Sequence, residues 1–330
     1  KRMIMTEKEY FLGIDTSNYK TSIAVVDGFG KIIADERKFL TVKKGERGIR
    51  QSEALFQHIN NLPVLLESLT NYLEIKNRIQ AVAVSKKPRP LENSYMPVFN
   101  AGYSIGKSLS YILGIPLYEF SHQEGHIEAI KFNNFVPQSL KFIAFHFSGG
   151  TTEAILVDET LHDSKKYEVV GGSRDISYGQ LLDRVGVSLG MEFPCGEAMD
   201  RSLFESKTNY KQIKLPPIKV NDGFINISGI ETACQRITDI SDSRDLIYSL
   251  FIRIIESIEE MTEQLSGKYG ISDFIYAGGV ASSRFIRENL RLGYNLCFGE
   301  PKLSADNAVG IALLGRNRYG IETDNSNTIK

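Results

Sequence analysis

Runs of apolar residues separated by short polar segments divide the chain into many predicted strands and helices. Two stretches of equal length, residues 11–27 and 142–158, each consist of an apolar strand, a polar turn and a second apolar strand. Aligned end to end, they carry identical residues at 11 and 142, 17 and 148, 21 and 152, 26 and 157, and 27 and 158. Any hairpin shares part of this pattern, so the elements that follow decide whether it is a repeat.

Both hairpins are followed by alternating strands and helices. After the first we predict strands at 31–40, 81–85 and 116–120 and helices at 52–73 and near 101–114. After the second we predict strands at 166–173, 274–279 and 295–298 and helices at 178–189, 245–265, 282–290 and about 304–320. The chain therefore reads as two similar halves.

This layout predicts an α/β fold of the duplicated, two-lobe sugar kinase/heat-shock chaperone/actin type. In that layout a nucleotide lies in the cleft between the lobes, and both hairpin turns face its phosphates. We expect one lobe at 1–133 and a second at 134–330, with the last helix packing back on the first lobe. A single doubly wound sheet is the structural alternative, but its strands should all be joined by crossover helices.

Composition narrows the function classes. The chain has 330 residues, 42% of them hydrophobic, and 39 Lys and Arg against 40 Asp and Glu give a net charge of -1. No global basic field therefore indicates nucleic acid binding, and an RNA contact would need a local patch. Cys195, Cys234 and Cys297 form neither a disulfide framework nor a thiolate metal motif. With no signal peptide and no apolar run of spanning length, we expect a cytoplasmic protein without a membrane segment.

The turn of the second hairpin has the chemistry of a phosphate-binding loop. Glycines without Cβ atoms let a ligand approach backbone N–H groups, and neighbouring hydroxyl groups can donate hydrogen bonds. The residues concerned are Ser148, Gly149, Gly150, Thr151 and Thr152. A plain glycine hairpin turn is the alternative, and the matching position of the turn in a repeated half favours phosphate binding.

His122 and His126 are four residues apart, which on a helix places both imidazoles on one face. This is a common geometry for a shared metal ion, although a carboxylate would have to come from elsewhere. The zinc protease pattern H-E-x-x-H does not fit, because Glu124 is two positions after His122, not one. Two imidazoles without a metal remain the alternative on spacing alone.

Several motifs in the same order resemble the Gcp/TsaD glycoprotease-like family. The stretch "KSLSYILGIPLYEFSHQEGHI" at 107–127 fits the signature of that family. Further matches are "GIDTSNYKTSIAVV" at 13–26, "SGGTT" at 148–152, "GQLLDRVGVSLGMEFPCGEAMD" at 179–200, "AGGVASS" at 277–283 and "ADNAVGIA" at 305–312. The resemblance implies a tRNA threonylcarbamoyltransferase fold, in which an activated threonylcarbamoyl group passes from its adenylate to an adenine amine of tRNA.

The resemblance also implies ligands and roles for individual residues. The metal would be one divalent ion, iron or zinc with magnesium as a further option, held by His122, His126 and Asp306. ATP or an acyl-adenylate would contact the turn at 148–152 and a second set of residues: Asp183, Gly196, Asp200, Gly278, Gly279 and Ser283. The first hairpin supplies the candidate catalytic residues, Asp15 and Lys20.

The sequence departs from the family pattern on the acceptor side. Tyr19 and Lys20 replace an acidic pair, Thr151 replaces a histidine, and Ser283 replaces the asparagine that contacts the base. The loop at 86–102 is longer and more basic than its family counterpart. The chain is therefore predicted to be a divergent paralogue of the housekeeping enzyme that acts on tRNA or on another acceptor.

Two basic loops, at 41–51 and 85–93, could contact tRNA phosphates or could simply carry solvated charge. Their cations are Lys43, Lys44, Arg47, Arg50, Lys86, Lys87 and Arg89. Protein subunits of a tRNA-modifying complex are further candidate partners.

Three functions follow from these observations. The favoured one is a metal- and nucleotide-dependent carbamoyl-type transferase acting without a covalent enzyme intermediate, since the sequence shows no obvious nucleophile–base pair. The second is a non-catalytic nucleotide-binding paralogue that serves a tRNA-modifying enzyme. The third is a small-molecule kinase on the same fold, for which Asp15 is the evident candidate base.

Overall fold

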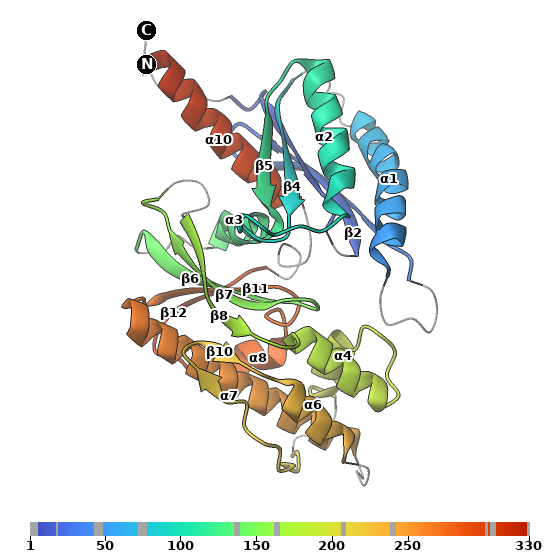
Figure 1. Ribbon diagram of the computed structural model, residues 1–330, viewed down its shortest axis with the longest axis vertical. Coiled ribbons are helices and arrows are strands. Elements are labelled where there is room, and N and C mark those ends of the chain that lie inside the picture. Colours follow the sequence, from blue (N-terminus) through green and yellow to red (C-terminus); the bar gives the residue numbers. More distant parts are fainter. Residues whose placement is uncertain are drawn as a thin grey trace. The chain divides into compact units, whose positions relative to one another are not determined.

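The computed structural model describes residues 6–17, 19–42, 49–71, 78–134, 139–161, 166–205, 209–237, 242–300, 303 and 308–328 (Figure 1). The chain divides into two compact units. Unit 1 comprises residues 1–133 together with 302–330, and unit 2 comprises residues 134–301. The segment 302–330, expected to belong to the second lobe with its helix packing back on the first, is therefore part of unit 1.

Unit 1 is built on one mixed sheet. Its strands are β1 (Tyr10–Asp15), β2 (Lys20–Asp27), β3 (Ile32–Phe39), β4 (Ile79–Lys87) and β5 (Leu117–Ser121), in the order β3-β2-β1-β4-β5. β1 pairs antiparallel with β2 and parallel with β4. The hairpin predicted at 11–27 is thus β1 and β2, and β1 lies at the centre of the sheet.

Helices cover both faces of this sheet. They are α1 (Gln51–Ser68), followed by the short 3-10 helix η1 (Leu69–Asn71), α2 (Phe99–Leu113), α3 (His122–Asn134) and α10 (Val309–Thr328). Leu12 and Ile14 of β1 pack with residues of α1 and α2, whereas Phe11 packs with residues of α10 and α3. Alternate side chains of the strand therefore enter opposite cores, which explains why its sequence has no charged residue before Asp15. Figure 1 shows α1 and α2 on one side of the sheet and α10 on the other.

Unit 2 contains the second sheet. Its strands are β6 (Lys141–Phe147), β7 (Thr152–Asp158), β8 (Tyr167–Ser173), β9 (Val220–Asn221), β10 (Phe224–Ile225), β11 (Asp273–Ala277) and β12 (Asn295–Phe298), in the order β12-β11-β6-β7-β8-β10-β9. Its helices are α4 (Tyr178–Ser188), α5 (Gly196–Ser202), α6 (Ser228–Gln235), α7 (Ser243–Tyr269) and α8 (Arg284–Asn289). The long helix α7 buries residues such as Leu250, Ile254 and Met261 in a core shared with α4 and β11.

The two sheets share one strand order. In unit 1 the central strand β1 lies between its hairpin partner β2 and the parallel strand β4, and in unit 2 β6 lies between β7 and β11 in the same senses. The second hairpin strand ends in each case at an aspartate whose Oδ1 caps the next turn. Asp27 accepts from the N–H groups of Phe29 and Lys31, and Asp158 accepts from the N–H and hydroxyl of Thr160. The coincidence of Asp27 and Asp158 in the sequence thus reflects a shared turn.

Two further findings concern the cysteines and the helices. Cys195, Cys234 and Cys297 are buried free thiols. Among the described residues, no helix combines the length and the apolar character needed to cross a membrane.

Candidate functional site

A buried carboxylate stands at the end of β1. Asp15 is 0% exposed, accepts hydrogen bonds from Ser17 Oγ (2.6 Å) and Ser85 Oγ (2.5 Å), and lies 3.1 Å from His122 Nδ1. Burial alone would raise the pKa of Asp15, but the charge of His122 and hydrogen bonds from His122, Ser17 and Ser85 outweigh burial and lower this pKa. Asp15 is therefore an ionised carboxylate held by polar neighbours.

The two predicted metal-ligand histidines lie together at the start of α3. Their Nε2 atoms are 2.9 Å apart, and both side chains are buried. An ionised carboxylate can only accept a hydrogen bond, so the proton on His122 belongs on Nδ1, facing Asp15. The Nε2 atom of His122 then faces His126, and this atom carries a lone pair when His122 binds a metal ion as a neutral imidazole. This is the arrangement in which a carboxylate orients a metal-binding imidazole.

The distance between the two nitrogens is that of two neighbouring ligands in an octahedral site. Two imidazole nitrogens each about 2.1 Å from one ion are about 3.0 Å apart at the octahedral angle of about 90° and about 3.4 Å apart at the tetrahedral angle. Without an ion, the same 2.9 Å separation accommodates an N–H···N hydrogen bond. Within the described parts of the chain, no group of three or more His, Cys, Asp or Glu side chains could hold a metal ion. The third predicted ligand, Asp306, lies outside the described residues.

Residues before and after Asp306 in the sequence share a core with α3, the helix that carries His122 and His126. Leu303 and Ala308 belong to the same core cluster as Ala129 of α3. At the start of α10, a Cβ on Gly310 would collide with the carbonyl oxygen of Gly125 and lie 3.0 Å from the nitrogen of Ala129. Two glycines therefore permit close packing of α10 against α3, one residue before His126.

The other candidate catalytic residue, Lys20, is in a different environment. It is the first residue of β2 and pairs with Phe39 at the end of β3. The Nζ atom of Lys20 lies 4.8 Å from the centre of the Phe39 ring, a cation–π contact. The residues that contact the carboxylate of Asp15 are instead Ser17, Ser85 and His122.

The turn after β6 is open. Gly149 and Gly150 are exposed, and a Cβ on either would meet nothing within 4 Å. Two hydrogen bonds join the ends of this turn. The N–H of Ser148 donates to the carbonyl oxygen of Thr151 at 2.8 Å, and the N–H of Thr151 donates to Ser148 Oγ at 3.2 Å. Backbone N–H groups of such a turn are accessible to an anion.

The N-terminus of α4 lies against this open turn. Ser177 caps the helix together with Gln180 and donates its hydroxyl hydrogen bond to the carbonyl oxygen of Gly149 at 2.7 Å. Tyr178 N–H donates to Thr152 Oγ1 at 2.8 Å. A Cβ on Gly179 would lie 2.5 Å from the Ser148 carbonyl oxygen, so only glycine permits this approach. The partial positive charge of the helix N-terminus and the glycine turn are thus adjacent.

The glycines after β11 lie beside the same strand end. Gly278 has φ +94°, and a Cβ there would collide with the carbonyl oxygen of Phe147, the last residue of β6. The N–H of Val280 donates to that same oxygen at 3.0 Å. Gly279 is exposed, with open space at its Cβ position. The loop that begins at Gly278 is therefore fixed next to the turn at 148–151.

Two of the predicted ribose and base contacts, Asp183 and Asp200, accept hydrogen bonds from backbone N–H groups at the start of a helix. Asp183 Oδ1 accepts from the N–H of Cys195 at 2.7 Å, at the start of α5. Burial raises the pKa of Asp183, with hydrogen bonds from Cys195 and Gly196 opposing it. Asp200, in α5, in turn accepts from Ser283 Oγ at 2.5 Å and from backbone N–H groups at the start of α8. All eleven predicted nucleotide contacts thus lie in unit 2, joined through α4, α5 and α8 to the open turn.

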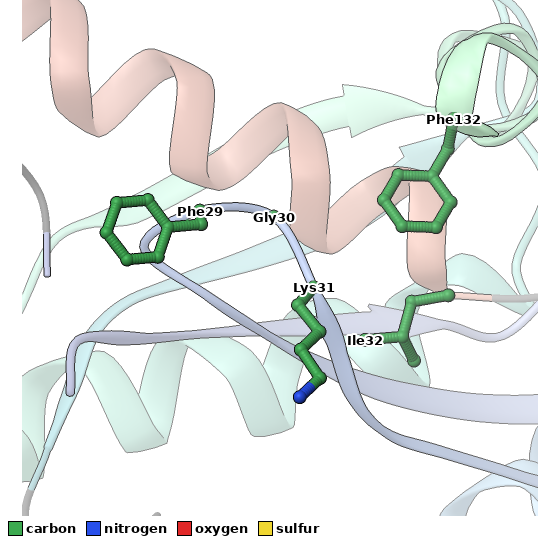
Figure 2. A pocket seen from close by; sticks show the side chains of 5 residues that line it. All are labelled: Phe29, Gly30, Lys31, Ile32 and Phe132. Carbon is green, nitrogen blue, oxygen red and sulfur yellow. The ribbon is translucent and has the colours of Figure 1, made fainter. Parts of the chain in front are cut away.

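A separate pocket of about 460 Å³ lies in unit 1 (Figure 2). Phe29, Gly30, Lys31 and Ile32 from the turn between β2 and β3 line it, together with Phe132 of α3. None of the predicted site residues lines this mainly apolar pocket.

Comparison with known proteins decides the family. The family model of the tRNA N6-adenosine threonylcarbamoyltransferase TsaD matches residues 31–313. The chain belongs to the TsaD family. A relative of that name from Syntrophomonas wolfei is 26% identical, over 96% of this chain and 95% of the relative. Another from Sulfurihydrogenibium is 30% identical, over 93% and 90% of the two chains. The predicted family resemblance and the predicted enzyme class, a transferase and not a protease, are confirmed.

Solved structures confirm the predicted fold class. Component A of the (R)-2-hydroxyglutaryl-CoA dehydratase from Acidaminococcus fermentans has a TM-score of 0.56 at 16% identity, covering 94% of this chain and 98% of that one. A ROK family glucokinase from Streptomyces griseus, in complex with glucose and AMPPNP, has a TM-score of 0.51 at 13% identity, covering 93% and 99%. The TsaD family member described here therefore has the two-sheet, actin-like ATPase fold.

Several residues of these sites were not singled out in the sequence. Ser85 contacts Asp15 across 70 positions, and Ser177 contacts Gly149 across 28. A local signal existed for Ser177, because S-x-x-Q before an apolar helix is a capping box. For Ser85 the signal was weaker, a polar residue near the end of a buried strand.

Proposed function

We propose that this TsaD family member is a transferase that binds a divalent metal ion through unit 1 and an adenine nucleotide or acyl-adenylate through unit 2. The group transferred is of the threonylcarbamoyl type, as in the names of its relatives. The observation that carries the proposal is the buried pair His122–His126, oriented by Asp15.

The metal ligands in this proposal are His122, His126 and Asp306. The packing of Leu303, Ala308 and Gly310 on α3 supports the assignment of Asp306, because these residues flank it in the sequence. An ion bound there would supply Lewis acidity toward phosphate or carbonyl oxygens. A scaffold protein needs no such centre, which favours the transferase over the non-catalytic alternative.

Asp15 acts in this proposal as a positioning residue. Its lowered pKa makes it a weak base, and its hydrogen bonds to Ser17 and Ser85 fix the carboxylate against His122. This argues against the kinase alternative, which needs Asp15 as a base facing a hydroxyl group.

The open turn and the loop at 278–283 hold the nucleotide in this proposal. Backbone N–H groups at Gly149 and Gly150 and the N-terminus of α4 bind phosphate oxygens. In the reaction, an acceptor amine attacks the carbonyl carbon of the acyl-adenylate. The new C–N bond forms, the bond from carbon to the phosphate oxygen breaks, AMP leaves, and the amine loses a proton. The protein contributes orientation of the two reactants.

The acceptor is either tRNA or another amine, because the acceptor-side residues depart from the family pattern. Lys86 pairs with Glu119 and lies 4.5 Å from the ring centre of Tyr103, while Lys87 bonds the carbonyl of Leu91. Of the cations in the loop at 41–51, Lys43, Lys44 and Arg47 lie outside the described residues. Charge reversal at Lys86, Lys87 and Arg89 should weaken a salt-dependent tRNA contact if tRNA is the acceptor.

The test is mass spectrometry of bulk tRNA nucleosides and metabolites from cells with the wild-type protein or the double variant H122A/H126A, combined with metal analysis and ATP calorimetry. We expect metal and ATP binding by the wild-type protein and one modified acceptor that disappears in the variant. Modified tRNA identifies tRNA as the acceptor; a modified small amine identifies an altered acceptor. A wild-type protein that binds neither ATP nor metal contradicts the proposal.

A further inference from the structure

Arg284 and Phe204 form a stacked pair next to the predicted base-contacting residue Ser283. The Cζ atom of Arg284 lies 4.1 Å from the centre of the Phe204 ring, so the ring covers one side of the guanidinium. The side chain of Arg284 is nevertheless 64% exposed. The guanidinium therefore lies over an aromatic ring while most of the Arg284 side chain is still accessible.

Neighbouring residues hold this pair in place. Glu288, one helical turn along α8, accepts from Arg284 Nε at 2.7 Å. Phe204 packs edge-on against Phe285, with ring centres 6.3 Å apart, and Phe285 is buried in the core. The guanidinium is thus bonded at Nε by a carboxylate and lies over the Phe204 ring, which in turn packs against Phe285. Ordering these side chains in advance reduces the entropy lost when a ligand binds.

Asp200 connects this pair to the nucleotide site. Its Oδ1 accepts from Ser283 Oγ and Phe285 N–H, and its Oδ2 accepts from Arg284 N–H at 3.1 Å. The same carboxylate that holds Ser283 therefore also sets the position of Arg284. Phe204 follows Asp200 by four residues, just after the end of α5, so the carboxylate and the aromatic ring belong to the same short segment.

We propose that the purine base of the nucleotide stacks on the open side of the Arg284 guanidinium, with Phe204 as its support. This inference rests on the proposed nucleotide site in unit 2 and adds a residue that determines affinity for the base. A guanidinium stacks favourably on aromatic faces, and a purine presents such a face whatever its substituents. Arg284 then recognises the presence of a base and not the phosphate charge.

The test compares two probes that differ only in the base, AMP and ribose 5-phosphate, by ligand-observed NMR titration of the full chain. R284A should weaken AMP binding roughly five- to fifty-fold and leave ribose 5-phosphate binding unchanged. R284K keeps the charge but not the planar group, so it should behave like R284A. F204A should cause a smaller loss of AMP affinity. R318A is the matched control, since Arg318 forms a similar exposed pair with Glu322 on α10.

Each outcome decides the question. If R284A weakens the binding of AMP and of ribose 5-phosphate equally, Arg284 contacts the phosphate and the stacking proposal is overturned. If R284K binds AMP as the wild-type protein does, the charge of the side chain is sufficient and the proposal is overturned as well. Unchanged AMP binding in R284A would overturn it as well, while leaving the nucleotide site intact. If the wild-type protein binds no AMP, the proposed nucleotide site fails and this inference fails with it. Circular dichroism of each variant excludes loss of folding as the cause.

Discussion

The turns after β1 and β6 occupy equivalent places in two sheets with the same strand order, yet their chemistry is opposite. At the first position, the buried carboxylate of Asp15 accepts hydrogen bonds from Ser17 and Ser85 and lies against His122. The second turn is open, with the Cβ positions of Gly149 and Gly150 facing empty space. Equivalent positions in the two sheets therefore hold a fixed anion in unit 1 and accessible backbone N–H donors in unit 2.

The neighbouring parallel strands differ in the same way. In unit 1, β4 brings the hydroxyl of Ser85 to the carboxylate of Asp15. In unit 2, β11 ends at Gly278, whose missing Cβ lets the following loop bind the end of β6 through Val280. The duplicated topology thus fixes where the sites lie, and side chains at the strand ends decide whether a cation or an anion is favoured.

The largest expected effect separates the two units through the metal. H126A removes one of the two imidazole ligands, so we expect metal affinity to fall more than about 100-fold. ATP binding by unit 2 should be retained. Metal analysis after dialysis against defined metal concentrations measures the metal affinity, and calorimetry measures ATP binding. K131A on the same helix is the control, because Lys131 pairs with Glu128. Metal retention in H126A would contradict the assignment.

A smaller effect should follow when the buried carboxylate loses its charge. In D15N the residue keeps its shape but no longer provides an anion to orient His122, so metal affinity should fall about 10- to 100-fold. S17A should have a smaller effect, since it removes one hydrogen bond to Asp15 but leaves the charged carboxylate facing His122. Competition with a metal chelator measures both. Equal metal affinity in D15N and the wild-type protein would show that Asp15 has no positioning role.

Gly179 of α4 tests how closely this helix must approach the open turn, and Gly267 of α7 provides the comparison. In G179A the new Cβ would collide with the backbone of residues 148 and 149, so we expect a loss of about 1–3 kcal/mol in the free energy of unfolding. In G267A, within α7, the new Cβ meets nothing within 4 Å, and alanine should stabilise the helix by about 0.5–1 kcal/mol. Urea unfolding of both variants measures these values. Similar stability of the two variants would contradict the close packing.

The smallest expected effect concerns acid stability of unit 2. Burial alone would raise the pKa of Asp175, but backbone hydrogen bonds from Ile227, Ser228 and Ile176 outweigh it and lower this pKa. A folded-state pKa below the unfolded value of about 3.9 stabilises the protein above that pH, and the contribution is lost as pH falls toward the folded-state pKa. Unfolding between pH 5 and pH 2 (about the range of this titration) should show a smaller acid-induced loss in D175N. Parallel pH curves for the two proteins would contradict this.

Much of the fold was predictable because its elements carry strong local patterns. The two hairpins, the buried strand β4 and helices α2, α4 and α7 all have clear apolar periodicity. The short elements β9, β10, α5 and α6 were not predicted. Two-residue strands carry no periodicity, and α5 and α6 begin in segments whose order comes from the carboxylates of Asp183 and Asp175 at a distance.

The sites were predictable where one short segment carries the chemistry. His122 with His126, and the glycine turn at 148–152, are of this kind. The contacts that orient them are not, because Ser85, Ser177 and Gly179 reach their partners only after strands and helices have packed. The metal role of Asp306 stays a prediction.

The most direct test of the contrast between the two turns is the ATP affinity of G149V, measured by calorimetry. The valine side chain enters space that is empty in the protein, so folding should be unchanged while phosphate access to the turn is blocked. G229V, also at a position with open space, is the control. We predict that G149V loses at least about tenfold in ATP affinity, the equivalent of roughly one charge-assisted hydrogen bond. Wild-type ATP affinity in a folded G149V protein would show that the open turn is only a hairpin connection.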